Sequence, residues 1–366
     1  DKKNDAYVVI EDGELEMGTI DDAAIINSGR LQLSVDVTNV NGEDDIEPID
    51  NHQNSKAYVY PRDMKKKILF EEFTGQDCIN CPSGMATVNN VLSDYEDQYV
   101  EVYHHAGYKD DNFTTLEDSE YTWFYNGGGN TYAPACMANR HPALPSLTSA
   151  VVMSNDLGSV QNTVKSAMLT APYVGINMEN SYDNESRTGT VSIELTCYQE
   201  PSELEHRLNV WLVQDSIMRY QNGAGIIMHN NAFRMSLTGT WGDVVTLNEG
   251  DTQTLTFEYA LPESIVGEYA VNFMSEEGIE DVDDKNIVAK ANNMRIVAFV
   301  ADLSENALKC TVWNAEECIV TDIPDGIVEV EMKNDAKSAI YDLQGRVVKS
   351  PRRGLYISNG KTFIKR

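Results

Sequence analysis

The chain has 366 residues, of which 58 are acidic and 28 are basic, so its formal net charge is -30. A surface this negative repels phosphates, which excludes nucleic acid as an expected partner. Because the sequence contains no run of about 18 apolar residues, we expect no transmembrane helix. Hydrophobic residues make up 42% of the chain, enough to bury real cores, and the length predicts two to four domains.

Residues 1–64 predict a small β-rich region that ends in a linker. Leu31, Leu33, Val35 and Val37 alternate with polar residues, which is the period of a half-buried strand. Residues 47–62 contain two prolines, which is typical of a linker.

Residues 65–172 predict a strand, a helix and a parallel strand. The apolar run 68–70 indicates a buried strand, and apolar residues after Pro82 recur at helical spacing. Residues 99–103 are the next strand, and the crossover between the two strands should be right-handed. An inserted helix and loop, a short strand at 133–138 and a helix capped by Ser154 are expected to follow.

Cys78 and Cys81 lie between the first strand and its helix. Unpaired N–H groups and the helix dipole favour a thiolate at a helix start, and the thiolate is the attacking species in disulfide exchange. We therefore assign Cys78 as the nucleophile and Cys81 as the resolving thiol. A Cys-x-x-Cys pair beside a βαβ unit predicts a thioredoxin-like redox domain.

Two other interpretations of the cysteine pair remain open. The pair can form a static disulfide, and a Cys78 sulfur buried from solvent would favour this interpretation. A zinc site would need further ligands from His104 and His105, because the sequence has no second Cys-x-x-Cys. We expect no metal and no cofactor.

Four further residues are candidates for the site. Glu72 is either a buried acid that exchanges a proton with Cys81 or an exposed carboxylate. Pro134 is either a cis-proline that shapes a substrate groove or an ordinary trans-proline. His104 and His105 end the second strand, where the carboxyl ends of parallel strands face a site, but packing or solvation of these rings is the simpler expectation.

Residues 173–322 predict an antiparallel β-sandwich of the immunoglobulin or fibronectin kind, because apolar residues recur with a period of two. Residues 323–366 predict a last small β module. The fold class is therefore α/β plus all-β, in several domains. The candidate sandwich strands are 174–178, 191–197, 208–212, 255–259, 269–273, 296–300 and 310–312.

The segment FEEFTGQDCINCP at residues 70–82 resembles the 28-kilodalton outer membrane protein family of Bacteroidetes. Residues 105–107, 134–140, 211–215, 229–234 and 239–242 look like further blocks of that family. The resemblance covers about residues 65–320. It implies a thioredoxin-like domain followed by a sandwich, exported to the envelope, with Pro134 as the cis-proline and Glu72 as the buried acid. No Trp precedes Cys78, which departs from thioredoxin itself.

The end of the chain is similar to the C-terminal sorting domains of type nine secretion, through residues 339–348 and 354–357. Such domains imply export to the cell surface, although a short β module of this pattern can also be a structural cap.

Several residues outside the Cys78 site have simpler interpretations. Cys310 and Cys318 flank an expected turn at 314–317 and are candidates for a hairpin disulfide. His229 and Arg234 can form either a ligand site or, as we expect, a hydrogen-bond cluster that supports the fold.

The leading hypothesis is an exported protein of the outer membrane, cell surface or periplasm that exchanges thiols and disulfides with other proteins. Its partners would be protein thiols or disulfides and a redox partner that recharges the cysteines. The alternative is a non-catalytic surface interaction or adhesion protein with a structural Cys-x-x-Cys disulfide.

Overall fold

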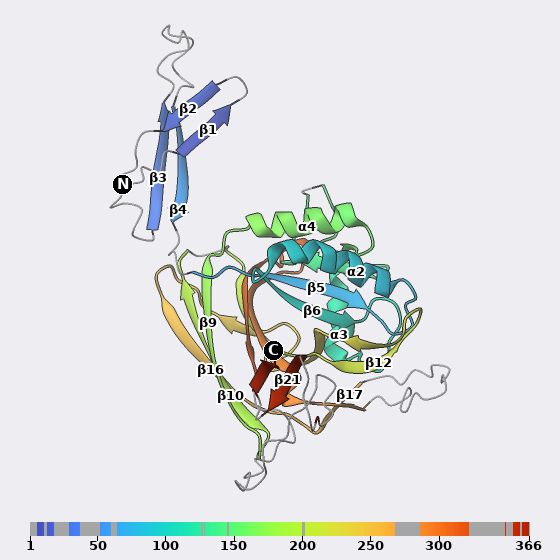
Figure 1. Cartoon of the computed structure of the whole chain (residues 1–366). Helices are drawn as coiled ribbons and strands as arrows, with labels where there is room; N and C mark the ends of the chain where they lie inside the picture. The colour runs from blue at the N-terminus through green and yellow to red at the C-terminus, as the bar shows by residue number, and fades with distance from the viewer. Residues whose placement is uncertain are drawn as a thin grey trace. The chain divides into compact units, whose positions relative to one another are not determined.

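The computed structural model describes residues 64–321, except 126, 128, 145, 200–201 and 268–285, together with residue 348 and six terminal strands (Figure 1). The chain divides into two compact units, Asp1–Asp322 and Ile323–Arg366. The described structure is mostly β, with several sheets and few helices. No helix among the described residues is long and apolar enough to cross a membrane.

Two antiparallel hairpins form the described part of residues 1–64. β1 (Ala6–Ile10) pairs with β2 (Gly13–Met17), and β3 (Gly29–Asp36) pairs with β4 (His52–Val59). β3 confirms the strand that Leu31, Leu33 and Val35 predict. The linker predicted at 47–62 is wrong over its centre, which β4 occupies. Pro48 and Pro61 lie outside β4, so they do not remove backbone donors from its ladder.

A third antiparallel hairpin lies near the end of the chain. β21 (Gly354–Ser358) pairs with β22 (Lys361–Lys365), and Asn359 and Gly360 separate the two strands in the sequence. The rest of the predicted C-terminal module, apart from residue 348, lies outside the described residues.

The strand–helix–strand order predicted around the cysteines is confirmed. β5 (Ile68–Thr74) is followed by α2 (Cys81–Leu92), and β6 (Tyr99–His105) is parallel to β5. β7 (Ala135–Ala138) pairs antiparallel with β5, and β8 (Val152–Met153) pairs with β7. The order in this part of the sheet is β6-β5-β7-β8, and α2 and α4 (Leu157–Leu169) pack together over it (Figure 1).

The helices outside this unit are short. The inserted helix expected within 108–130 is α3 (Leu116–Tyr121), which begins with a capping box between Thr115 and Asp118. The cap of α4 is Asp156 rather than Ser154, because the Asp156 carboxylate accepts the first free N–H groups of the helix. The 3-10 helices are η2 (Ser93–Tyr95), η3 (Thr122–Phe124), η4 (Ala291–Asn293) and η5 (Ala307–Lys309).

The sheet continues past β6 into the second half of the chain. Ala232 in β14 (Ala232–Ser236) pairs in parallel with Tyr103 of β6, and β11 (Glu205–Gln214), β19 (Met294–Leu303) and β20 (Val312–Ile319) follow in that order. β15 (Asp243–Val245) pairs with β11. Strands from both sides of residue 172 therefore belong to one nine-stranded sheet.

A second, three-stranded sheet has the order β16 (Thr252–Ala260), β10 (Thr188–Cys197), β9 (Val174–Asp183). Its apolar residues share a core with one face of β11 and β19, through side chains such as Ile193, Leu212 and Ile296. The strands predicted at 174–178, 191–197, 208–212, 255–259 and 296–300 are confirmed, and the one at 269–273 lies outside the described residues. The turn predicted at 314–317 is wrong, because β20 runs through it while paired with β19.

Six short strands of this half were not predicted from the sequence: β14, β15 and the four strands of two hairpins. β12 (Ile217–Gln221) pairs with β13 (Gly225–His229), and β17 (Ser264–Val266) pairs with β18 (Asn286–Val288). Of these, the β12–β13 hairpin contacts the cysteine loop.

β5 divides its side chains between two cores. Ile68 and Phe70 pack with residues of α2 and α4, whereas Leu69 and Phe73 join a core that contains Trp211. This alternation places Glu72 on the face covered by the helices and Glu71 on the opposite face.

Candidate thiol–disulfide site

Cys78 and Cys81 form a disulfide at the start of α2, with their Cα atoms 5.4 Å apart. The N–H of Cys78 donates to the carbonyl oxygen of Gly75, and that of Cys81 donates to the carbonyl oxygen of Cys78. The first turn of α2, which the structure describes fully, carries no acidic side chain. Nothing in that turn therefore offsets the positive end of the helix dipole, which favours a thiolate at this position when the disulfide opens.

Glu72 is fully buried rather than exposed. It lies opposite Tyr103 in β6 and Cys136 in β7, on the face that α2 covers. Neither of its carboxylate oxygens makes a hydrogen bond of standard geometry in the described structure, although the hydroxyls of Tyr103 and Ser154 lie close enough to favour the ionised form. Burial, with the charge of Glu101 in addition, raises the pKa of Glu72 well above its usual value. Burial therefore favours the protonated form of Glu72.

Pro134 lies beside the first turn of α2. The peptide bond between Ala133 and Pro134 is cis. A Cβ placed on Gly84 would come within 2.5 Å of the Pro134 Cβ and 3.1 Å of the Ser154 Cβ. Because Gly84 has no side chain, α2 can approach the strand that Pro134 precedes.

The β12–β13 hairpin covers the loop that contains Cys78. The Gln221 side-chain amide donates to the carbonyl oxygens of Gly75, at 3.0 Å, and Cys78, at 2.9 Å. The backbone N–H of Asn222 donates to the Gln76 carbonyl oxygen at 2.7 Å. Cys78 is only 3% exposed, so its sulfur is not freely accessible while the hairpin is in this position.

This cover was not predicted from the sequence. Asn222 and Gly223 are a dipeptide typical of hairpin turns, and this signal could have identified the hairpin. It could not have identified the surface on which the hairpin packs, because that surface lies more than 140 residues earlier in the chain.

His105 contacts the cysteine loop through Asp111. Its Nδ1 lies 2.8 Å from Asp111 Oδ2, and that same oxygen accepts the N–H of Gln76 at 2.7 Å. The His105 ring also stacks on Phe113, with ring centroids 4.1 Å apart. This arrangement positions the loop, and it agrees with the simpler expectation of a packed ring.

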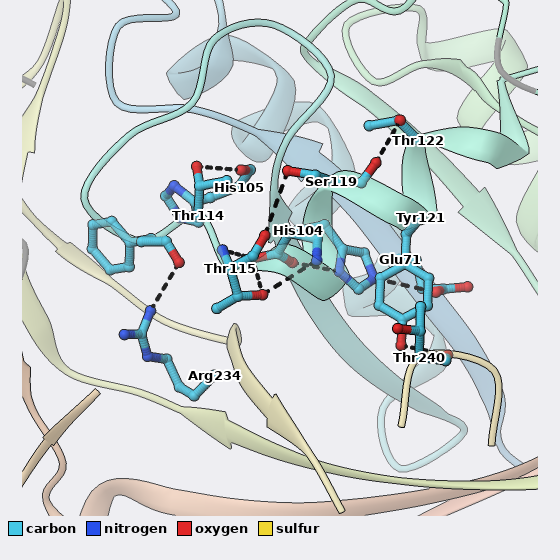
Figure 2. A network of polar contacts seen from close by, with 12 residues as sticks. Glu71, His104, His105, Thr114, Thr115, Ser119, Tyr121, Thr122, Arg234 and Thr240 are labelled. Atoms are coloured by element: carbon cyan, nitrogen blue, oxygen red, sulfur yellow. Dashed lines mark hydrogen bonds and ion pairs between the residues drawn. The ribbon is translucent and has the colours of Figure 1, made fainter. Parts of the chain in front are cut away.

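His104 points into a different cluster, on the opposite face of the sheet (Figure 2). Its two ring nitrogens lie 2.9 Å from Asp118 and 3.2 Å from Glu71. Although burial alone would lower it, the hydrogen bonds to Asp118 and Glu71 raise the pKa of His104. These hydrogen bonds favour the charged form of His104 within a buried network.

Arg140 completes this network and was not among the predicted site residues. Its guanidinium binds Glu71 with two hydrogen bonds of 2.9 and 2.8 Å and lies 4.5 Å from the centre of the Phe124 ring. Burial would raise the pKa of Glu71, but the Arg140 charge and the bonds from His104 and Arg140 lower it to about 2. We interpret the cluster as structural, because all of its charges are paired.

Other candidate residues do not join the cysteine site. Arg234, which is labelled in Figure 2, donates to the carbonyl oxygens of Phe113 and Ile265, both at 3.2 Å. These bonds agree with its expected role in the fold. Cys310 and Cys318 are free thiols and do not form the hairpin disulfide, because Cys310 precedes the extended strand β20 and Cys318 lies near its far end. Among the described residues, no group of three His, Cys, Asp or Glu side chains is arranged to hold a metal ion.

Comparisons with known proteins identify relatives of the fold. HBP35 of Porphyromonas gingivalis is similar in structure, with a TM-score of 0.51 and 16% identity over 82% of this chain and 98% of that chain. Two solved structures are less similar. A protein from Agrobacterium tumefaciens has a TM-score of 0.44 and 12% identity over 71% and 96% of the two chains. A domain of the outer membrane lipoprotein Omp28 from Porphyromonas gingivalis has a TM-score of 0.23 and 15% identity, over 41% of this chain and 88% of that chain.

None of the curated proteins matches the sequence. Residues 124–290 match the family model described as outer membrane protein Omp28. The matched range begins after the cysteine pair and includes β7, the β12–β13 hairpin and Trp241. Over residues 124–290 this chain is similar to the outer membrane protein Omp28 family, and this similarity indicates a protein of the cell envelope.

Proposed function

We propose that this envelope protein carries out thiol–disulfide exchange on protein substrates through Cys78 and Cys81, in a thioredoxin-like domain. The strand order β6-β5-β7-β8 supports the thioredoxin-like assignment, with β5 and β6 parallel and the other two pairings antiparallel. The cysteine pair at the start of α2 supports it as well, since this is the expected place of a redox Cys-x-x-Cys.

The observation that carries the proposal is the buried, unbonded carboxyl of Glu72. A buried polar group without a partner destabilises a fold, and such groups concentrate at functional sites. A static disulfide does not require a buried acid on the face of β5 that α2 covers. A disulfide that opens does, because the Cys81 sulfur leaves as a thiolate and must take up a proton.

In the proposed exchange, the Cys78 thiolate attacks one sulfur of a substrate disulfide and forms a mixed disulfide. Once Glu72 has given up its own proton, the Cys81 thiol transfers its proton to that carboxylate and attacks Cys78. This attack releases the reduced substrate and restores the Cys78–Cys81 disulfide. The reverse sequence oxidises a substrate dithiol by the same two steps. The backbone beside Pro134 would hold the substrate chain.

Because Cys78 is buried, this exchange requires movement of the β12–β13 hairpin. Its cover depends on hydrogen bonds from Gln221 and Asn222, each of the kind that contributes about 1 kcal/mol. The free energy needed to break these hydrogen bonds is small compared with the free energy of global unfolding.

A second function is favoured by that same burial. A Cys78 sulfur hidden from solvent is what we expect of a static disulfide, and the protein would then be a non-catalytic interaction protein of the cell surface. In that case the disulfide would hold the loop that the hairpin binds.

The two functions are separated by an assay with the full chain and dithiothreitol as reductant. The exchange proposal expects the wild type to accelerate reduction of a protein disulfide such as that of insulin, and Cys78→Ser to abolish the acceleration. Cys318→Ser, which removes a free thiol elsewhere, is the matched control and should retain activity. If wild type and Cys78→Ser are equally inactive, and the reduction potential lies below about -300 mV, the static disulfide is correct.

Two finer assignments accompany this function. We propose that the β16-β10-β9 sheet and the face of β11 and β19 form an immunoglobulin-like or fibronectin-like sandwich, which their common core supports. We also propose that the C-terminal residues act as a type nine sorting domain, which the β21–β22 hairpin supports. Deletion of residues 323–366 would then retain the protein inside the cell envelope instead of on the surface, as measured by surface labelling.

A further inference from the structure

Three polar side chains follow one another on the helix-covered face of β5 and β6. Glu72 lies opposite Tyr103 in the parallel register, and Glu101 precedes Tyr103 by two residues and therefore shares its face. None of them is more than 8% exposed. Three oxygen-bearing groups in a row are unusual on a face that is otherwise lined by residues such as Phe70, Val88 and Ala138.

Tyr103 lies between the two acids. Its hydroxyl donates to Glu101 Oε1 at 3.1 Å, and on its other side it faces Glu72. The second Glu101 oxygen accepts from Asn231 Nδ2 at 2.7 Å, which holds the carboxyl in place. A rotation of one hydroxyl can thus connect Glu72 with Glu101.

Glu101 also reaches a polar pocket of about 260 Å³ at the surface. Burial raises the pKa of Glu101 to about 7, which suits a group that gains and loses a proton at neutral pH. The charged and titratable groups that face it come from several elements, and the pocket is lined by Lys67, Asp97, Tyr99, Glu101, Asn231, Arg295 and Glu317.

We propose that Glu72, Tyr103 and Glu101 form a proton path between this pocket and the Cys78–Cys81 site. The proposal rests on the exchange function proposed above and identifies how Glu72, the buried acid of that function, regains its proton. When a substrate dithiol opens the disulfide, the Glu72 proton goes to the Cys81 thiolate. Tyr103 then passes its hydroxyl proton to Glu72 and takes one from Glu101, which is reprotonated from water in the pocket. The two electrons come from the substrate dithiol, and no group on the path changes its oxidation state.

The path explains features that a structural role does not. Replacing the three groups by apolar residues would leave no charge or donor unpaired in β5 and β6, whereas the present arrangement buries two acids within reach of one hydroxyl. Glu101 lies away from the cysteine loop, on the side of Tyr103 that faces Asn231 and Arg295. Its position therefore suits exchange with solvent, not contact with the substrate.

The test is Tyr103→Phe in the full chain, because this change removes one hydroxyl and keeps the ring. We expect exchange with dithiothreitol to slow by about tenfold or more at neutral pH, and the inflection of rate near pH 7 to disappear. Glu101→Gln should have the same effect. Tyr121→Phe is the matched control, since it removes a buried hydroxyl that donates to Thr240 on the opposite face of the sheet, and its rate should equal that of the wild type. An unchanged rate and pH profile in Tyr103→Phe would overturn the path.

A second measurement does not depend on exchange activity. Infrared difference spectra after a pH jump record the protonated carboxyl of Glu72, identified by its absence in Glu72→Gln. The path predicts that deprotonation of Glu72 is delayed by about tenfold or more in Tyr103→Phe relative to wild type. If Glu72 loses its proton equally fast in wild type and in Tyr103→Phe, the path is refuted even if the protein exchanges thiols. If deprotonation of Glu72 is slower in Tyr103→Phe but the wild type exchanges no thiols, the path is supported and only the exchange function is refuted.

Discussion

The side-chain amide of Gln221 donates a hydrogen bond of 2.9 Å to the carbonyl oxygen of Cys78, although 143 positions separate the two residues in the sequence. The same amide group binds Gly75, so one side chain holds both ends of the loop before α2. We predict that Gln221→Ala loosens the hairpin and increases the rate at which dithiothreitol reduces the Cys78–Cys81 disulfide. Loss of two hydrogen bonds of about 1 kcal/mol each shifts the opening equilibrium by about 10- to 30-fold.

The matched control for this prediction is Gln253→Ala. The Gln253 amide also donates to a backbone carbonyl, that of Thr246, but at the exposed end of β16. Its removal should leave the reduction rate unchanged. If both variants react at the wild-type rate, the hairpin does not control access to the disulfide.

Glu72→Gln should stabilise the protein above pH 4.5. The pKa of Glu72 is raised from 4.5 in the folded state, so its contribution to stability is fully present below pH 4.5 and is lost as the pH rises through the folded pKa. Each pH unit in that window removes about 1.4 kcal/mol from the wild type. Gln cannot ionise and avoids this loss. Urea unfolding between pH 4 and pH 9 measures the difference, and Glu258→Gln at an exposed position of β16 should show none.

Arg140→Met should destabilise the protein by about 3–5 kcal/mol at pH 7, because it leaves the buried carboxylate of Glu71 without its main partner. Denaturant unfolding measures this value. Glu205→Ala, which breaks the exposed pair with Arg207, should cost no more than about 1 kcal/mol. A loss in Arg140→Met as small as that of the control would show that Glu71 is not ionised.

The Glu71 network also predicts how the wild type responds to acid. The pKa of Glu71 is about 2 in the folded state against 4.5 for the free group, so its contribution is present above pH 4.5 and is lost as the pH falls toward 2. The free energy of unfolding should therefore decrease over this window in the wild type. The decrease should be smaller in Glu71→Gln, as measured by urea unfolding at successive pH values.

Gly84→Ala should destabilise the protein although Ala favours helices by about 1 kcal/mol. The added Cβ would collide with Pro134 and Ser154, and overpacking of this kind costs about 1–3 kcal/mol. Thermal unfolding measures the net effect. Ser83→Ala, at the neighbouring exposed position of α2, should change stability by less than about 0.5 kcal/mol. A variant of Gly84 as stable as wild type would mean that α2 does not press on Pro134.

The helix and strands around the cysteines could be predicted because the sequence patterns that indicate them are local. The apolar run of β5, the helical spacing after Pro82 and the cysteine spacing all fall within 25 residues, and the strand–helix–strand order followed from them. The period of two likewise predicted β9, β10, β11, β16 and β19. β4 was missed because its residues, from His52 to Val59, show no apolar alternation and gain their pairing only from β3.

By itself, the sequence determined that Cys78 and Cys81 lie at the start of a helix behind a buried strand, and that a β-rich half follows. Only the tertiary structure decided that Glu72 is buried without a partner, that Arg140 neutralises Glu71, and that Gln221 covers Cys78. Periodicity and spacing report the conformation of neighbouring residues. Burial and pairing depend on contacts between distant segments, such as Gln221 and Cys78 at a separation of 143 positions, which local patterns do not encode.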